Sequence, residues 1–193
     1  MKKALILLLG LLLLAACSSQ NTVPKEGKEM KEIAVFETNK GVFEVTLNRM
    51  AAPDTVENFV QYINDGHYDG TVFHRVIGNF MVQGGGFTAD GKQKATRAPI
   101  KLESNNGLKN KAGSVAMART NVPDSATSQF FVNVVDNNFL NYAPGNDGYA
   151  VFGKVTSGME VIEDIRAVPT EVKHGMPDWP KEEVVIEKAY MKS

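Results

Sequence analysis

Short apolar runs, separated by polar segments that contain glycine, dominate the chain after residue 32 and constrain its fold most. The clearest runs are residues 113–119, 128–136, 149–155 and 183–191. They are rich in β-branched and aromatic residues and too short for typical helices, so they predict strands. Many short strands with few helices indicate an all-β barrel or sandwich. A barrel would also remove exposed strand edges.

The start of this region predicts a β-hairpin. Residues 33–48, IAVFETNKGVFEVTLN, carry β-branched and aromatic residues on both sides of a turn at Asn39, Lys40 and Gly41. Behind the turn, apolar and polar residues alternate, as they do in a strand with one buried face.

Two segments have the apolar spacing of a helix. In residues 53–66, apolar side chains recur at i, i+3, i+4 and i+7, and we expect Asp54 to cap the start and Gly66 to end the helix. A second helix is expected from Ser157, where SGME has the form of a capping box, towards Pro169.

Length and charge limit the classes of function. The chain has 193 residues, 43% apolar and 22% charged, which is enough for one well-buried domain. Its formal charge of −1 provides no basic field for phosphate backbones, so nucleic-acid binding is not expected.

The first residues differ from the rest. Lys2 and Lys3 precede an apolar run, residues 4–14, which leads into LAAC with the only cysteine of the chain, Cys17. This pattern is typical of a secretory signal, and LAAC resembles the lipobox of bacterial lipoproteins. The run is about half of the roughly 20 residues that a spanning helix needs, so a permanent anchor is the weaker alternative. A leader that merely ends near a free thiol is another, although such a thiol is a liability in an oxidising compartment.

The lipobox resemblance implies three parts of the chain. We expect residues 1–16 to be removed as a signal peptide, residues 17–31 to form a lipidated Cys17 with a flexible tether, and residues 32–193 to form the domain. Losing two lysines and no acid changes the formal charge from −1 to −3. With its only thiol acylated, the mature protein forms no internal disulfide. The expected location is the cell envelope, facing the periplasm or the exterior, on the outer membrane if the cell is Gram-negative.

Three common kinds of site lack their usual residues. No helix is expected after the glycines at 84–86, which therefore predict tight turns and not a phosphate loop. His67, His74 and His174 are scattered, so no metal site is expected, and His74 is predicted to be a satisfied structural histidine. No G-x-S-x-G elbow indicates a hydrolase, although a triad assembled from distant residues stays open.

The stretch FHRVIGNFMVQGGG, residues 73–86, places a lone cation, Arg75, and an amide, Gln83, in an apolar run. On strands interrupted at Gly78, Arg75, Met81 and Gln83 share one face. The other interpretation is that Arg75 pairs with an acid at the rim of a barrel.

This stretch and three others, GSVAMAR, SATSQFFV and FLNYAPGNDGYAVFGKV, resemble the cyclophilin family of peptidyl-prolyl cis-trans isomerases. The motifs keep the family's order and spacing over about residues 32–193. MART and DSATSQFF are most similar to the periplasmic bacterial branch. The resemblance implies an all-β fold: a closed, eight-stranded antiparallel barrel with two flanking α-helices. It also implies an enzyme that rotates X-Pro bonds without metal or cofactor.

The resemblance implies a set of site residues as well. The catalytic positions fall on Arg75, Phe80 and Gln83. The substrate-binding positions fall on Met81, Ala118, Arg119, Gln129, Phe131, Phe139, Leu140 and Tyr149. Phe139 stands where other members carry a tryptophan whose N–H meets cyclosporin, and Tyr149 replaces a histidine that titrates.

An arginine suits this reaction for a physical reason. The amide before proline resists rotation by roughly 18–20 kcal/mol, because its nitrogen shares a lone pair with the carbonyl. At the twisted transition state the lone pair is free, and a fixed donor binds it better than it binds either planar ground state. Arg75 is always charged and offers several donors from one plane, so no proton transfer is needed.

The expected partners are proline-containing polypeptides that fold in the cell envelope, and the domain is expected to be a monomer. Two other classes of function stay open. A tethered peptide-binding or chaperone module would use the same pocket without turnover. An envelope adhesin would use the barrel surface, although no patch in the sequence indicates one.

Overall fold

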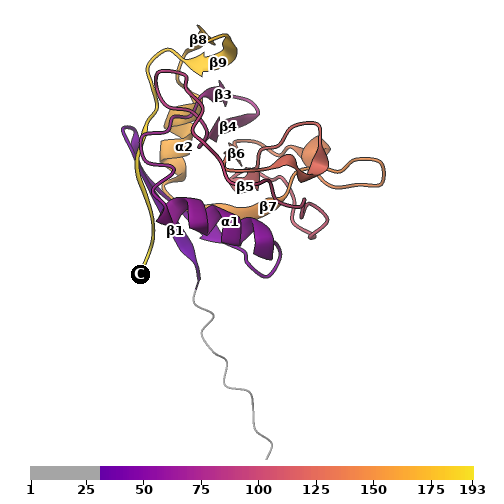
Figure 1. Cartoon of the computed structure of the whole chain (residues 1–193). Coiled ribbons are helices and arrows are strands. Elements are labelled where there is room, and N and C mark those ends of the chain that lie inside the picture. Colours follow the sequence, from indigo (N-terminus) through magenta and orange to yellow (C-terminus); the bar gives the residue numbers. More distant parts are fainter. Residues whose placement is uncertain (1–30) are drawn as a thin grey trace, which may run out of the picture. The chain divides into compact units, whose positions relative to one another are not determined.

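The computed structural model of the chain describes residues 31–193. The expected signal peptide, Cys17 and nearly all of the tether lie outside these residues. The chain can be followed along its colours in Figure 1. The strands are β1 (Ile33–Thr38), β2 (Gly41–Leu47), β3 (Arg75–Ile77), β4 (Met81–Gly84), β5 (Ser114–Met117), β6 (Phe130–Asn133), β7 (Val151–Ser157), β8 (Thr170–Lys173), β9 (Met176–Pro180) and β10 (Ile186–Met191). The helices are α1 (Pro53–Asn64) and α2 (Met159–Arg166), with 3-10 turns η1 (Pro123–Ser125) and η2 (Asn138–Leu140).

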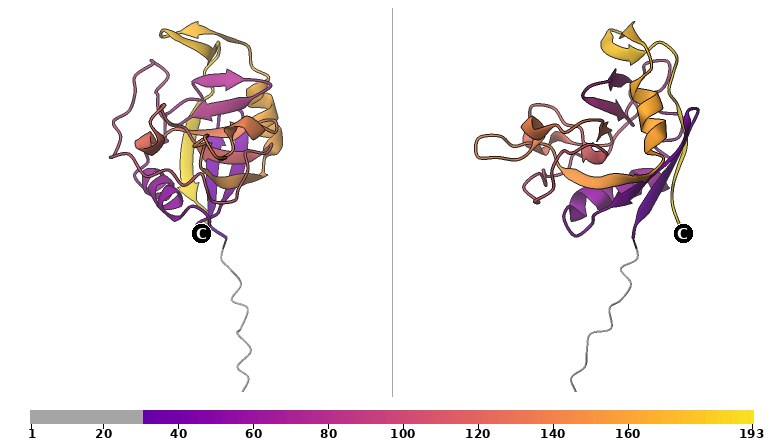
Figure 2. Two further views of the ribbon diagram at one scale, coloured as in Figure 1. Left: turned by 90° about the vertical axis from the view of Figure 1, so that its right-hand side faces the viewer. Right: turned by 180° about the vertical axis from the view of Figure 1, so that it is seen from behind.

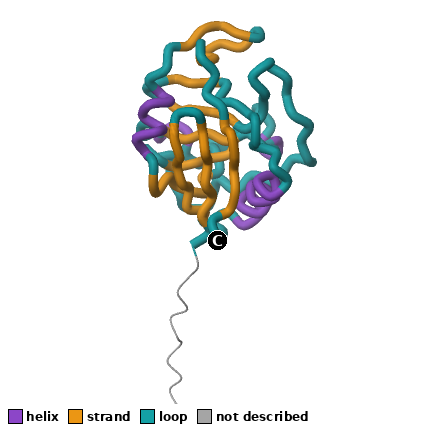
Figure 3. The backbone as a smooth tube through the Cα atoms, turned by 90° about the vertical axis from the view of Figure 1, so that its left-hand side faces the viewer, coloured by secondary structure: helices purple, strands orange, loops and turns teal. Residues whose placement is uncertain are grey.

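Eight of the strands form one antiparallel sheet in the order β10-β1-β2-β7-β5-β6-β4-β3. The first and last strands of the chain, β1 and β10, are therefore neighbours. Figure 3 shows the long strands side by side, with the helices on either flank. The all-β fold with two helices and the predicted first hairpin are confirmed.

The prediction of a closed barrel is wrong, because β10 and β3 are the edges of the sheet. The chain before β3 does run beside the chain before β10, where the Phe73 N–H donates to the Val184 carbonyl at 2.9 Å. That contact contains one isolated bridge, between Val72 and Val185, and no continuous ladder. With only three residues, β3 is too short to extend this contact into a ladder with β10. The sheet is an open half-barrel.

The interior of the half-barrel holds the main core. Its largest members are aromatic: the Phe36 and Phe43 rings stack at 5.0 Å, and the Phe59 and Phe152 rings lie 4.7 Å apart. Both helices contribute their apolar faces, with Val56, Phe59 and Ile63 from α1 and Val161, Ile162 and Ile165 from α2. Burying each such side chain contributes about 1.5–3 kcal/mol, so the helices are held by packing on the sheet.

The helix α1 begins two residues earlier than a cap at Asp54 would place it. Pro53 is its first residue, since a fixed φ and a missing N–H suit that position, and Asp54 therefore lies inside the first turn and does not cap it. The N–H groups of the first turn, which have no partner within the helix, are satisfied by a residue far away in the sequence. The Glu103 carboxylate accepts the Thr55 N–H at 2.8 Å and the Thr55 hydroxyl at 2.6 Å. Gly66 follows the helix with a φ of +64°, as a residue that ends a helix should.

The capping box predicted at Ser157 is also absent. Ser157 is the last residue of β7, and Gly158 precedes α2 with a φ of +74°. A Cβ at Gly158 would lie 2.2 Å from the Val42 carbonyl oxygen. Only glycine fits between the end of β7 and the backbone of β2, so close packing decides the helix start here and side-chain capping does not.

A second, two-stranded sheet of β8 and β9 was not predicted from the sequence. It projects beyond the edge of the main sheet (Figure 2), where β9 lies against β3. Trp179 anchors it: the indole is fully buried, 5.9 Å from the His74 ring and 6.3 Å from the Phe87 ring. Apart from the buried Pro180, the other residues of the hairpin are exposed or partly exposed, and a second proline stands in β9, so their pattern gives no strand signal.

Candidate active site

The strands β4, β5 and β6 are buried on both faces, except at Gln83 on β4, which is partly exposed. Side chains alternate along a strand, so Phe130 points into the main core while Phe131 points out of it. The outward side chains form a second apolar cluster, which we call the outer cluster: Met81, Ala116, Phe131, Leu140 and Val151. This explains why β4, β5 and β6 read as continuous apolar runs and not as alternating ones.

The strand register aligns the polar residues of the site with the outer cluster. Arg75 on β3 is paired with Gln83 on β4, and Gln83 is paired with Phe131 on β6. In the next row, Ile77 is paired with Met81. The prediction that Arg75, Met81 and Gln83 share one face is confirmed.

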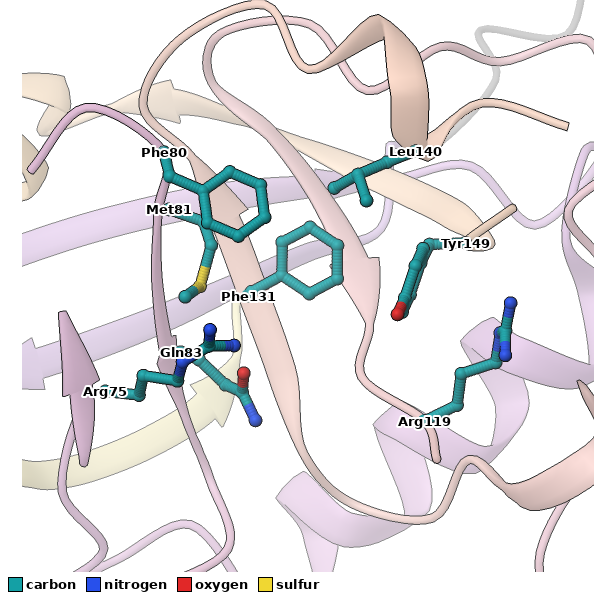
Figure 4. A pocket seen from close by; sticks show the side chains of 8 residues that line it. All are labelled: Arg75, Phe80, Met81, Gln83, Arg119, Phe131, Leu140 and Tyr149. Atoms are coloured by element: carbon teal, nitrogen blue, oxygen red, sulfur yellow. The ribbon is translucent and has the colours of Figure 1, made fainter. Parts of the chain in front are cut away.

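A pocket of about 170 Å³ lies over the outer cluster. Figure 4 shows Phe80 and Met81 on one side, Leu140 and Tyr149 on the other, and Phe131 between them. The lining residues are Arg75, Phe80, Met81, Gln83, Arg119, Phe131, Leu140 and Tyr149. All eight were named from the sequence. The structure brings them together, and their roles towards a substrate stay predictions.

The other three residues named from the sequence lie beside the pocket. Gln129 accepts a hydrogen bond from the Gln83 amide at 2.9 Å, which fixes the orientation of Gln83. Ala118 packs against the outer cluster. Phe139 stacks on Phe80 with ring centroids 5.5 Å apart and is 66% exposed, so it extends the apolar wall outwards.

Arg119 holds the side of the pocket that contains Tyr149. Its guanidinium lies 4.6 Å from the centre of the Tyr149 ring and donates to the Gly148 carbonyl from Nε at 3.0 Å and from Nη2 at 2.8 Å. The Tyr149 ring meets Phe131 edge-on at 5.6 Å. Most of the Arg119 donors therefore bond to the protein itself, and the side chain positions the Tyr149 ring as a wall of the pocket.

Arg75 has one nearby acid. Its Nε lies 3.8 Å from a carboxylate oxygen of Asp178 on β9, and the two side chains are 42% and 38% exposed. An ion pair this long and this exposed stabilises a protein by about 1 kcal/mol or less. An acid at the rim is therefore present, but it does not account for an arginine beside an apolar pocket.

His74, next to Arg75, points to the opposite side of β3 and is buried. Its ring packs 4.7 Å from the Phe87 ring, and burial lowers its pKa to about 4. The prediction of a satisfied histidine is wrong in one respect, since Nδ1 has no hydrogen-bond partner among residues 31–193. The ring is held by aromatic packing.

Of the glycines at 84–86, which were predicted to make tight turns, Gly84 is the last residue of β4, and the chain bends at Gly85 and Gly86. Gly85 has a φ of +82°, and a Cβ at Gly86 would lie 2.5 Å from the side chain of Gln129. Within the described part of the chain, no group of three or more His, Cys, Asp or Glu side chains could hold a metal ion. No helix of residues 31–193 has the length and apolar character needed to cross a membrane.

Sequence reasoning missed the buried amides behind the pocket, Asn110, Asn133 and Asn137. A signal for one of them was present, because Asn133 is a polar residue inside the apolar run FFVNVV. Asn110 and Asn137 lie in loops with several other polar residues, and nothing in their local sequence marks them as buried.

Comparisons with known proteins agree with this geometry. The family described as cyclophilin type peptidyl-prolyl cis-trans isomerase/CLD matches residues 33–191. A peptidyl-prolyl cis-trans isomerase of Acinetobacter baylyi is 49% identical over 193 residues, which cover 100% of this chain and 97% of that protein. The peptidyl-prolyl cis-trans isomerase B of Escherichia coli is 51% identical over 158 residues, 80% of this chain and 96% of that protein.

A solved structure gives the same result for the fold. The crystal structure of a Cryptosporidium parvum cyclophilin type isomerase, in the presence of the dipeptide Ala-Pro, matches with a TM-score of 0.69 and 25% identity. The match covers 83% of this chain and 99% of that one. The chain therefore belongs to the cyclophilin family and is a peptidyl-prolyl cis-trans isomerase.

Proposed function

We propose that Arg75 stabilises the twisted transition state of an X-Pro bond whose proline ring lies in the pocket over Phe131 and Met81. The observation that carries the proposal is the strand register, which aligns Arg75 with Gln83 and Phe131 and so sets a permanent cation beside an apolar floor. The C. parvum isomerase was crystallised in the presence of Ala-Pro, a dipeptide that contains proline.

The chemistry follows from the change at the proline nitrogen. In the planar amide this nitrogen offers no free lone pair, whereas at the twisted transition state it accepts a hydrogen bond from the guanidinium. The apolar surroundings lower the local dielectric and strengthen that bond. Gln83, oriented by Gln129, anchors the backbone of the peptide, and Phe80 walls the proline ring.

Replacement of the arginine tests the proposal. Arg75→Ala is expected to lower kcat/KM for an X-Pro peptide by roughly 10²- to 10³-fold, as for the loss of one transition-state donor. Arg75→Lys keeps the charge but loses the planar arrangement of donors, so its kcat/KM is expected to lie between those of the wild type and Arg75→Ala. Arg49→Ala is the matched control, since Arg49 pairs with Glu32 and Glu57 and does not line the pocket. A full rate in Arg75→Ala would refute the assignment.

The same variant separates catalysis from binding in the cell. A chaperone that only holds clients would use the apolar floor, which remains in Arg75→Ala. We propose that turnover matters, and we expect folding of a proline-rich envelope client to slow in cells that carry Arg75→Ala, although purified Arg75→Ala still binds that client. Unchanged client folding in those cells would favour the binding module.

We also propose that the protein works as a monomer on proline-containing polypeptides of the cell envelope, attached through a lipid on Cys17. The LAAC sequence and the polar segment after it support this proposal. Cys17→Ser is expected to move the protein from the membrane pellet to the soluble fraction, while Ser18→Ala stays in the pellet. A Cys17→Ser protein that remains in the pellet would contradict lipid attachment.

A further inference from the structure

Three asparagine side chains lie buried behind the pocket without lining it. Asn110, Asn133 and Asn137 are 1%, 0% and 2% exposed. A buried amide is costly unless its donors and acceptor are satisfied, and these three bond to one another and to their surroundings. Outside the trio, Asn133 Nδ2 donates to Ser114 Oγ at 2.9 Å and Asn110 Nδ2 donates to Asn141 Oδ1 at 3.3 Å.

The three side chains form one continuous line of hydrogen bonds, which we call the amide chain. Asn137 Nδ2 donates to the Phe80 carbonyl at 2.8 Å and to Asn133 Oδ1 at 2.7 Å. Asn133 Nδ2 donates to Asn110 Oδ1 at 3.1 Å. Asn110 Nδ2 donates to the Leu140 carbonyl at 3.0 Å. The line therefore runs from the backbone of Phe80 to the backbone of Leu140.

The two ends of the amide chain hold opposite walls of the pocket. Figure 4 shows Phe80 and Leu140 on either side of Phe131. Neither is inside a strand: Phe80 lies just before β4, and Leu140 is the last residue of η2. Backbone bonds hold each wall separately, since the Phe80 carbonyl also accepts the Val134 N–H at 3.2 Å and the Leu140 carbonyl accepts the Tyr149 N–H at 2.9 Å. The amide chain joins these two carbonyls to each other through side chains.

Stability alone gives a weak reason for an amide at the middle position. Asn133 lies on β6 two residues after Phe131, on the same face, and is paired with Met81. An apolar side chain there would extend the outer cluster, and replacing buried polar partners together by apolar groups of the same shape is often neutral. A fully bonded amide network instead specifies one arrangement of the groups that it joins.

We propose that Asn133 and Asn137 are positioning residues that set the width of the proline pocket through Phe80 and Leu140. They contact no substrate themselves. The inference rests on the proposed function, since it takes the ring between these two walls to be the proline of the substrate. A pocket of fixed width distinguishes the five-membered ring of proline from a ring that has one more methylene.

Ring-size selectivity tests this directly. The wild-type enzyme is expected to isomerise an Ala-Pro peptide faster than the matching peptide with pipecolic acid, the six-membered analogue, by at least about 10-fold in kcat/KM. Asn133→Leu, of similar volume, breaks the middle of the amide chain, and we expect the ratio to fall about 10-fold, mainly through a higher KM for proline. If the wild type shows no preference, or if folded Asn133→Leu keeps it, the inference is wrong.

Two further variants separate the width of the pocket from general stability. Ile165→Ala lowers stability through the main core, away from the pocket, and is expected to keep the ring-size ratio. Asn137→Ser is a milder break, since a hydroxyl donates to one partner only, and it replaces Asn133→Leu if that variant does not fold. A ratio that falls equally in Ile165→Ala would show a general loss of order and overturn the inference.

The same assay distinguishes failure here from failure of the proposed function. Arg75→Ala removes the donor and leaves both walls in place, so it is expected to slow both peptides by the same factor. If Arg75→Ala slows both peptides and the asparagine variants keep the ratio, only the amide chain is refuted. If Arg75→Ala has no effect, the catalytic assignment itself fails.

Discussion

Phe130 and Phe131 are consecutive residues of β6 with opposite surroundings. Phe130 lies in the main core, within 5.5 Å of the rings of Phe59 and Tyr68, under cover of the helix α1. Phe131 lies in the outer cluster, which loops cover incompletely, so the pocket remains above it. One strand thus serves stability with one face and binding with the other.

The two faces are also held by different interactions. The main core depends on apolar packing, which is non-directional and tolerates small shifts. The loops over the outer cluster are tied by side chains to backbone carbonyls: Asn106 donates to Val151 at 2.8 Å and Asn146 donates to Phe139 at 3.0 Å. Ser104 donates to Asp147 in the same way. Directional bonds suit the face that must keep a fixed shape.

The largest expected effect comes from deleting each ring in turn. Phe130→Ala is expected to lower the free energy of unfolding by about 3–5 kcal/mol, as for a large ring removed from a core. The activity of its folded fraction should change little. Phe131→Ala should destabilise less, because the pocket already bounds one side of its ring, but lower kcat/KM roughly 10²-fold through misplacement of the proline.

Urea unfolding and an X-Pro peptide assay, run where both variants are folded, check this pair. Equal losses of activity in the two variants would show that the two faces are not separate in function.

A smaller effect is expected from Arg119, on the loop side of the outer face. Arg119→Ala removes two hydrogen bonds to Gly148 and the contact with the Tyr149 ring. Partly buried contacts of this kind contribute about 1–2 kcal/mol together, so KM should rise by roughly 5- to 20-fold while kcat changes less. Steady-state kinetics separate the two constants. A fall in kcat alone would place Arg119 in the chemical step.

The sequence predicts the sheet side of the site better than the loop side. Residues 75–83 and 129–131 lie in short contiguous motifs, and strand alternation with register then places them on one face. The two helices were recognised from their period, but their starts depend on distant groups. Glu103 satisfies the first turn of α1 from 48 residues away, and no local pattern contains such a contact.

The wrong prediction of a closed barrel and the failure to predict the amide chain have the same reason. An alternating pattern shows that a strand has a buried face, but not whether its other edge finds a partner, and β3 has only three residues. Asn110 and Asn133 are far apart in sequence and meet only in the fold. The buried Trp179 likewise reveals the β8–β9 hairpin only once His74 and Phe87 are in place.

The acid beside Arg75 is expected to have a minor effect. Asp178→Asn keeps the shape of the side chain and removes the charge that lies 3.8 Å from Arg75 Nε. Because an exposed pair of this length is worth about 1 kcal/mol or less, the free energy of unfolding should change by no more than that, and kcat/KM by less than about 5-fold. Thermal unfolding and the peptide assay measure both. A loss as large as that of Arg75→Ala would mean that the ion pair, and not the arginine alone, makes the site.

The smallest effect on activity is expected from pH. His74 is the histidine next to Arg75, and its pKa is lowered to about 4 by burial, so it stays neutral from about pH 6 to 9. Among residues 31–193, no histidine lines the pocket. The value of kcat/KM should therefore be constant from about pH 6 to 9. A sharp inflection near pH 6.5 would contradict a mechanism without proton transfer.

Stability, in contrast, should fall below that range. His74 has an ordinary value of 6.5 and a folded pKa of about 4, so between these values the unfolded chain binds more protons than the folded one. The contribution of His74 to the free energy of unfolding is complete above pH 6.5 and is lost as the pH falls towards 4. The loss is up to about 1.4 kcal/mol per pH unit. Burial also lowers the pKa of His67, in the same direction.

Urea unfolding of the wild type and of His74→Phe at about pH 7, 6 and 5 isolates His74, since His67 titrates in both proteins. We expect the wild type to lose more stability than the variant, and parallel losses would place the acid sensitivity elsewhere in the core.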